Sequence, residues 1–356
     1  MIFSTLGRYF LARYIVTVGW FLFGIVAIIY LIDFSEVAGN VTAEAGQNIG
    51  DALIITALRL PYILQQTVPF IALFAGMVAL IALNRRHELV VTRAAGISVW
   101  QFMLPFVFGS FLLGLAAVFA LNPLASWSQT KALGLQAMAG GNTDTIPWLR
   151  QITDGQDTII GGRGIAENGS ELIGAVVIYF NDQGRIEKRQ DAKTATLSDG
   201  WWTLHDVTET RLGELSTHSA EVRVKTNLDE EFVQQHLVQP DLVSIYDLKD
   251  RISDARQFGV STKALETQYN YLLSLPLLLV AMTLIAATVC LKFSRFAQSP
   301  IVILGGILSG FLLYVTSVLV KAFGSSGVLS PLLAAWIPVI VAAALGLTIL
   351  LHQEDG

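Results

Sequence analysis

Few side chains in this sequence have the types and the spacing that catalysis or metal binding requires. Its five histidines are scattered along the chain without ligand spacing: His87, His205, His218, His236 and His352. The sequence has no Walker-type phosphate-binding loop, no HExxH and no GxSxG. Asp154 and Asp157 lie beside Gly155, but a solvated turn explains this stretch better than a calcium-binding loop. We therefore expect no catalytic centre, metal site or cofactor in this chain.

The most informative polar segment is NRRHELVVTRAAGIS, residues 84–98, which lies between two long apolar runs. Its charged start, the apolar residues from Leu89 onward and the small residues up to Gly96 predict a short interfacial helix that ends at Gly96. Its basic residues are either topology determinants or contacts to a soluble partner: Arg85, Arg86 and Arg93. Glu88 favours a soluble partner, because acidic residues contribute little to topology.

The composition indicates that lipid surrounds most of this chain. Of its 356 residues, 53% are hydrophobic and only 14% are charged, and the mean hydropathy is +0.57. A net charge of -5, without basic tracts interleaved with aromatic residues, argues against a nucleic-acid partner. The single cysteine, Cys290, lies in an apolar run, so it builds neither a disulfide framework nor a thiolate metal site, and we interpret it as a buried small residue.

Six apolar runs are long enough to cross about 30 Å of hydrocarbon as helices. They cover approximately residues 14–32, 52–83, 99–121, 271–291, 301–323 and 332–351. A cleavable signal peptide is the alternative for the first run, since Ala43-Glu44-Ala45 resembles a cleavage site, but the apolar core is too long and the site too distant. Pro61 and Pro69 predict a bent or tilted second span. Asn122-Pro123 predicts that the third helix stops at Leu121.

The distribution of basic residues predicts the orientation of these spans. One side of the membrane receives seven of them in short segments: Arg8, Arg13, Arg85, Arg86, Arg93, Lys292 and Arg295. On the other side, residues 33–51 contain no basic residue, and the connection between the fifth and sixth spans has only Lys321. We therefore expect both termini in the cytoplasm and the large middle region in the opposite compartment.

The middle region, residues 126–259, contains alternating segments separated by turn signals. LIGAVVIYF, RIEKRQDAKTATL and WWTLHDVTETRL predict antiparallel strands, and the series of hairpins favours a sandwich or a jelly-roll-like domain. Trp201 and Trp202 are expected on opposite faces of one strand, one in the core and one partly exposed. Residues 241–258 have helical spacing with one apolar stripe formed by Leu242, Ile245, Leu248 and Ile252. The expected division is thus residues 1–125, 126–259 and 260–356, with a 3+3 arrangement of spans.

These elements together resemble the LptF/LptG family of lipopolysaccharide export permeases over essentially the whole chain. The resemblance rests on ELVVTRAAGIS, on DAKTATLSDGWWTLHDV, on the 3+3 spans and on the last segment, SSGVLSPLLAAWIPVIVAAALGLTILLHQEDG, which is most similar to the LptG members. It implies a permease of the inner membrane with a periplasmic jelly-roll domain that stacks on those of its partners and lets acyl chains slide along a groove. Spans one and five would form lateral gates against an LptF-like sister permease.

The resemblance also implies partners that supply what this chain lacks. A homodimer of an LptB-like ATPase, with ATP and Mg, would bind from the cytosol, and LptC and the periplasmic bridge protein LptA would extend the route to the outer membrane. In that family residues 84–98 correspond to the coupling helix that docks into the ATPase, with an acidic residue where Glu88 stands. The chain would then be a permease subunit and not itself an enzyme.

Lipopolysaccharide has several acyl chains and anionic phosphates, so its site should be an apolar cavity with cations near the rim. Arg59 and Lys321 lie near span ends on the expected periplasmic side, where each can either meet phosphate or snorkel to lipid headgroups. The family often has a basic residue toward the outer end of span one, whereas this chain has Tyr30 and Asp33 there. We therefore predict that Arg59 replaces that basic residue as the contact to phosphate.

Two other classes of protein remain as alternatives. One is a different ABC permease, such as a lipoprotein or macrolide exporter, although those usually have four spans per chain. The other is a membrane-anchored scaffold that transports nothing. An intramembrane enzyme is disfavoured, because the spans contain almost no ionisable pair that would activate a water or a nucleophile.

Overall fold

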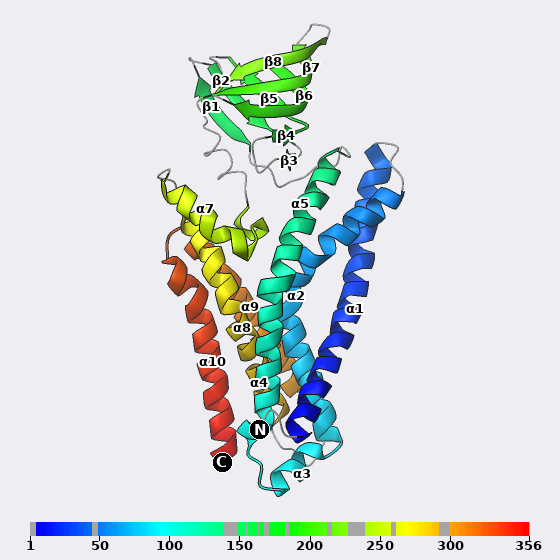
Figure 1. Cartoon of the computed structure of the whole chain (residues 1–356), viewed down its shortest axis with the longest axis vertical. Helices are drawn as coiled ribbons and strands as arrows, with labels where there is room; N and C mark the ends of the chain where they lie inside the picture. Colours follow the sequence, from blue (N-terminus) through cyan, green and yellow to red (C-terminus); the bar gives the residue numbers. More distant parts are fainter. Residues whose placement is uncertain are drawn as a thin grey trace.

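The computed structural model of the chain describes most of its 356 residues. Outside the described part lie residues 1–4, 45–48, 139–147, 154–155, 163, 167–170, 182–184, 199, 212–215, 227–238, 258–260, 292–299 and 356. Figure 1 shows a bundle of long helices with a β domain at one end and both chain termini near the other. We call these the β-domain end and the α3 end of the bundle.

Within the described residues, six helical segments are long and apolar enough to span a membrane, as the sequence predicts. The helices before the β domain are α1 (Thr5–Glu44), α2 (Ile49–Arg85), the short α3 (Glu88–Ala94), α4 (Val99–Ala116), the π-helical turn η1 (Ala117–Leu121) and α5 (Asn122–Met138). Those after it are the 3-10 turn η3 (Pro240–Leu242), α7 (Ile245–Gln257), α8 (Lys263–Cys290), α9 (Pro300–Ser325) and α10 (Pro331–Asp355). The predicted 3+3 order of spans is confirmed.

The spans differ in how much of their apolar surface the bundle covers. In the most apolar stretch of α8, 72% of the residues are buried, against 6% in α1 and 17% in α9. Helix α8 is therefore the packing centre, and α1 and α9 leave apolar faces for lipid or a partner. Helix α2 continues through Pro61 and Pro69, and Figure 1 shows its half nearer the β domain inclined to the other half, as expected for a proline-containing span.

The prediction that the third span stops at Leu121 is wrong. The helix passes through the π-helical turn η1 into α5, and the apolar span reaches Gln136. Pro123 has no N–H for the carbonyl four residues earlier, that of Phe119, but the hydroxyl of Tyr246 donates to this carbonyl at 3.0 Å. A donor from elsewhere in the chain thus satisfies the acceptor that the proline leaves free. The expected domain boundary at residues 125 and 126 consequently lies inside α5.

The middle region forms a single antiparallel sheet of eight described strands. They are β1 (Leu149–Thr153), β2 (Gln156–Gly161), β3 (Gly164–Ala166), β4 (Glu171–Ile173), β5 (Val176–Phe180), β6 (Ile186–Ser198), β7 (Trp201–Arg211) and β8 (Thr217–Lys225). The long strand β6 pairs with β7 along one edge and with β5 and then β4 along the other. The predicted strand LIGAVVIYF is therefore two strands, because the chain turns at Gly174, which has a φ of 62°.

The core of the β domain lies on one face of this folded sheet. Trp202 is fully buried, whereas Trp201 is 42% exposed, as the alternation of the strand predicts. At one end of the core the hydroxyl of Tyr179 donates to Gln190, whose amide donates to Glu209 at 2.7 Å. This hydrogen bond, with Lys188 and Arg211 nearby, holds the pKa of Glu209 below its usual range. This end of the core is thus closed by a hydrogen-bonded polar network.

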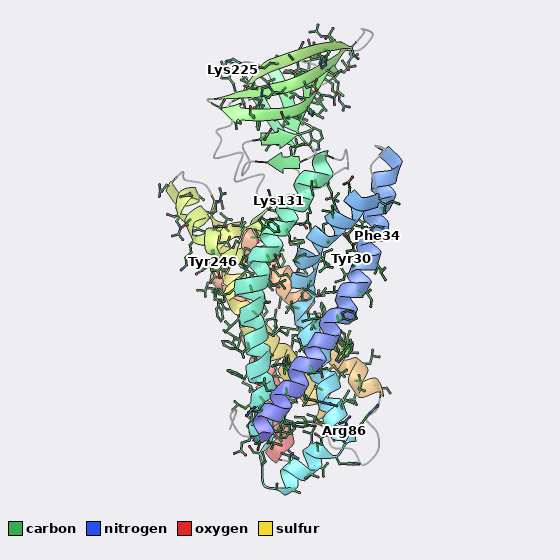
Figure 2. All side chains as sticks on the ribbon, turned by 45° about the vertical axis from the view of Figure 1, so that its right-hand side comes forward. Tyr30, Phe34, Arg86, Lys131, Lys225 and Tyr246 are labelled. Atoms are coloured by element: carbon green, nitrogen blue, oxygen red, sulfur yellow. The ribbon has the colours of Figure 1, made fainter. Side chains whose placement is uncertain are left out.

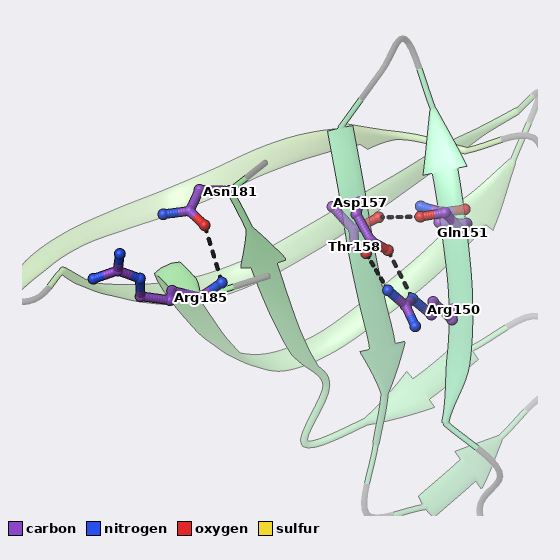
Figure 3. A network of polar contacts seen from close by, with 6 residues as sticks. All are labelled: Arg150, Gln151, Asp157, Thr158, Asn181 and Arg185. Atoms are coloured by element: carbon purple, nitrogen blue, oxygen red, sulfur yellow. Dashed lines mark hydrogen bonds and ion pairs between the residues drawn. The ribbon is translucent and has the colours of Figure 1, made fainter. Parts of the chain in front are cut away.

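An ion pair at the first hairpin accounts for Asp157, one of the two acidic residues that the sequence singles out (Figure 3). Asp157 on β2 accepts two hydrogen bonds from the guanidinium of Arg150 on β1, which lower the pKa of Asp157. Asp154 and Gly155 lie outside the described residues. In the described part of the chain no three metal-ligating side chains come together.

The predicted amphipathic helix after the β domain is present but starts later than expected. Residues 240–242 form the turn η3, and α7 begins at Ile245. Ile245, Leu248 and Ile252 are buried against the bundle, while Leu242 belongs to the turn and is only half-buried. The backbone N–H of Ile245 donates to the side chain of Asn122 at 2.8 Å. This bond fixes the start of α7 on the third span.

Close packing of α4 on α8 predicts that one added methyl group destabilises the bundle. A Cβ added at Gly114 on α4 would clash with the backbone of Pro276 on α8, whereas one added at Gly24 on α1 meets no atom within 4 Å. We expect Gly114→Ala to destabilise the bundle by about 1 to 3 kcal/mol through overpacking. Gly24→Ala should be neutral or slightly stabilising. Thermal unfolding of the detergent-solubilised chain measures both, and equal melting temperatures would contradict this packing.

Candidate coupling and substrate sites

The predicted interfacial helix is present as α3, at the end of the bundle opposite the β domain (Figure 1). His87, with a φ of 59°, turns the chain between α2 and α3, and its carbonyl accepts the N–H of Val91. Helix α3 ends at Ala94, and Gly96, with a φ of 81°, follows in the left-handed conformation that glycine allows. Helix α3 is therefore a defined element held at both ends by backbone turns.

The two faces of α3 have different environments. Leu89 and Thr92 are buried against the bundle, while Val90 and Val91 are 45% and 67% exposed. Leu89 thus anchors α3, and the exposed valines provide its outward apolar surface. The sequence predicts these valines as part of the apolar run but not which apolar residues face outward, because the direction in which the helix faces is set by its packing on the bundle.

The charged residues around α3 are placed in different ways. Glu88, in the first turn, accepts a hydrogen bond from the hydroxyl of Tyr9 on α1 at 3.2 Å. Arg85 and Arg86 are exposed, and Figure 2 shows Arg86 at the α3 end of the molecule. Arg93, in the last turn, is half-buried. The segment thus combines exposed basic and apolar groups with an acidic group tied to α1.

At the β-domain end, three of the predicted substrate residues lie together between α1 and α2. The guanidinium of Arg59 lies 3.2 Å from a carboxylate oxygen of Asp33, and these side chains are only 22% and 7% exposed. The hydroxyl of Tyr30 donates to the carbonyl of Leu53 on α2, and its ring stacks on that of Phe34. Figure 2 shows Tyr30 and Phe34 on the part of α1 nearer the β domain.

The ion pair between Arg59 and Asp33 has one unused acceptor. The second carboxylate oxygen of Asp33 is buried without a hydrogen-bond partner among the described residues. A paired charge inside a membrane protein is costly to break, because removing either member leaves the other uncompensated in a low dielectric. Asp33, where the chain departs from the family pattern, and the candidate Arg59 are therefore the two members of one ion pair.

Lys321 belongs to a second ion pair on the other half of the bundle. Its ammonium group lies 2.7 Å from Asp241 in η3 and 4.6 Å from the ring centroid of Tyr271 on α8. The sequence analysis missed Asp241 as the partner, because 80 residues separate it from Lys321. Both predicted phosphate-contacting cations are thus neutralised by carboxylates within the chain.

The ion pair between α1 and α2 predicts a non-additive effect on stability. Asp33→Asn alone and Arg59→Gln alone should each cost up to about 3 kcal/mol, less than a fully buried pair because Arg59 is partly exposed. The double variant should cost clearly less than the sum of the two. Thermal unfolding in detergent measures the cycle, and strictly additive losses would mean that the two side chains do not interact.

The fold and these sites define a class: a multi-pass membrane protein of six spans with one β domain inserted after the third. The sequence pattern of the family described as "Lipopolysaccharide export system permease LptF/LptG" matches residues 8–352. The chain belongs to this family, as the resemblance in its sequence predicts.

Individual relatives point to the same family. The chain is 25% identical over 308 residues to the lipopolysaccharide export system permease protein LptG of Haemophilus influenzae, with 83% of each chain covered. It is 26% identical over 325 residues to the protein of the same name from Escherichia coli K12, with 88% of each covered. The relatives are thus permease proteins of an export system, which favours this class over a scaffold or a four-span exporter.

Proposed function

We propose that this chain is the permease subunit of an ATP-driven transporter that extracts lipopolysaccharide from the inner membrane and passes it toward the outer membrane. The observation that carries the proposal is the arrangement of one six-span bundle with α3 at one end and the β domain at the other, in a chain of the LptF/LptG family. Energy would enter at α3 and lipid would leave at the β domain.

The charge distribution supports an orientation with α3 and both termini in the cytosol. Arg85, Arg86 and Arg93 cluster at the α3 end, where the positive-inside rule expects basic residues. The β domain then lies in the periplasm. In this orientation α3 offers a soluble ATPase dimer exposed apolar and basic groups, and ATP with Mg is bound by that partner and not by this chain.

The exposed apolar helices support a paired permease. Helices α1 and α9 bury few of their apolar residues within the chain, so a sister permease of the LptF type is the partner we propose for them. The lipid cavity would lie between the two subunits. LptC and the bridge protein LptA would then receive lipid from the β domain, whose sheet has an apolar core.

Conformational coupling follows from the contacts of α3. Closure of the ATPase dimer would move α3, and the buried Leu89 together with the bond from Tyr9 to Glu88 would transmit this movement to the bundle and to α1. Since α1 also carries Asp33, a shift of α1 would strain the ion pair with Arg59 at the other end. Nucleotide and substrate would thereby act on the same helix.

Substrate binding in this scheme is an exchange of anions on Arg59. A lipid phosphate replaces the carboxylate of Asp33 as the partner of the guanidinium, so that the cation is never left uncompensated. The pair is therefore compatible with a phosphate contact when the site is loaded. Lys321 can exchange Asp241 for phosphate in the same way.

The role of Glu88 can be separated from its contact with α1. Glu88→Ala should reduce ATPase co-purification or lipopolysaccharide export by about tenfold, because a charged contact to the partner is lost. Tyr9→Phe removes only the hydrogen bond within the chain and should retain ATPase binding. If Tyr9→Phe reproduces the loss, Glu88 acts through α1, and if Glu88→Ala exports normally, Glu88 has no part in coupling.

The proposed exchange of anions on Arg59 predicts opposite effects for substitutions of Arg59 and of Asp33. Arg59→Ala should lower lipopolysaccharide crosslinking and lipopolysaccharide-stimulated ATPase activity by about tenfold, whereas Asp33→Asn should raise crosslinking, because the competing carboxylate is gone. Arg59→Lys, which keeps the charge, is the matched control. Unchanged crosslinking and stimulation in Arg59→Ala would remove Arg59 from the substrate site.

A further inference from the structure

A pocket of about 630 Å³ lies where α7 covers the ends of α8 and α10 that are nearest the β domain. Its wall combines two cations, a carboxylate, an aromatic ring and the first residues of α10: Lys249, Arg256, Glu266, Tyr269, Ser330 and Leu332. None of these residues belongs to the ion pairs of Arg59 or Lys321, so the pocket is separate from the proposed substrate contacts.

The described residues that line the pocket carry one positive charge in excess, because Lys249 and Arg256 face a single carboxylate, Glu266. Arg256 donates to Glu266 at 2.7 Å, and the hydroxyl of Thr262 donates to the same oxygen, so this cation and this anion neutralise each other. Lys249 lies 5.7 Å from the ring centroid of Tyr269, and in the described part of the chain no carboxylate pairs with it. An anion is therefore the ligand that this charge favours.

The start of α10 also favours an anion in the pocket. The helix begins at Pro331, and the carbonyl of Ser330 accepts the N–H of Ala334 as its first intrahelical bond. The N–H groups of a first turn have no partner within the helix, and the helix dipole places positive potential there. Cations from α7 and the start of α10 thus meet in one pocket.

The surface next to the pocket is suited to acyl chains. The membrane span of α10 begins at Pro331, so the pocket lies at the depth of lipid headgroups. From there the outward face of α10 is apolar, with Leu332, Leu333 and Ile337 between 48% and 58% exposed. A polar, cationic pocket continuous with an apolar helix face matches an amphiphile that has a phosphate at its head.

We infer that this pocket binds an anionic glycerophospholipid from the leaflet nearest the β domain. Its phosphate lies against Lys249 and the start of α10, and its acyl chains run along the outward face of α10. One phosphodiester headgroup suits a pocket of this volume and single net charge better than the several phosphates and sugars of lipopolysaccharide. The bound lipid would hold α7, and with it the connection to the β domain, against the bundle.

The inference is tested with photoactivatable phosphatidylglycerol, carrying a diazirine near the carbonyl end of one acyl chain, added to the full chain in detergent. Crosslinked peptides identified by mass spectrometry should map to the first turns of α10. Lys249→Gln should lower this labelling by about tenfold, because one charge-assisted contact is lost. Lys249→Arg should retain it. Arg251→Gln removes the same charge from the same helix but not from the pocket wall, and should change labelling less than about twofold.

Competition distinguishes the ligand classes. Unlabelled phosphatidylglycerol should displace the probe, while diacylglycerol and inorganic phosphate should not. Labelling unchanged in Lys249→Gln, or reduced equally in Arg251→Gln, would overturn the inference. Displacement of the probe by any of three competitors would also overturn the inference. Displacement by diacylglycerol would show an unspecific apolar site, and displacement by inorganic phosphate would show an anion site alone. Displacement by lipopolysaccharide in preference to phosphatidylglycerol would place the pocket on the substrate route.

Discussion

The fold depends on the requirement that every backbone polar group in or near the hydrocarbon be satisfied within the protein. Near Pro123 in the third span, two backbone groups need a partner: the carbonyl of Phe119 and the N–H of Ile245 at the start of α7. Tyr246 donates to that carbonyl, and the side chain of Asn122 accepts the N–H of Ile245. The place where the helix passes Pro123 is thereby also the place where the returning chain is fixed. These two hydrogen bonds join the helix that leads into the β domain to the helix that follows it.

Two basic side chains in the spans are likewise paired within the protein. Arg59 and Lys321 are each neutralised by a carboxylate that another element supplies, Asp33 on α1 and Asp241 in η3. Such pairs keep cations available at the β-domain end without leaving them uncompensated in a low dielectric. They also join separate elements of the chain, α1 to α2 and η3 to α9.

The helices of the bundle differ in the surfaces that they expose. Helix α8 is packed on nearly all sides, whereas α1 and α9 present apolar faces that this chain does not cover. Helix α3 shows Val90 and Val91 outward at one end, and α7 shows cations at the other. The bundle therefore has a packed centre in α8 and exposed apolar or charged surfaces on the helices around it.

The sequence by itself determined the features that depend on local composition. Long apolar runs predict six spans, alternation predicts β6 and β7, and the order of elements identifies the LptF/LptG family, because each is recorded in neighbouring residues. Tertiary structure decided what depends on residues far apart in the chain. Where the helix continues past Pro123, the donor to the carbonyl of Phe119 is Tyr246, which lies 127 residues away. Likewise, the distant partners of Arg59 and Lys321 carry no local signal, since only folding brings opposite charges within contact.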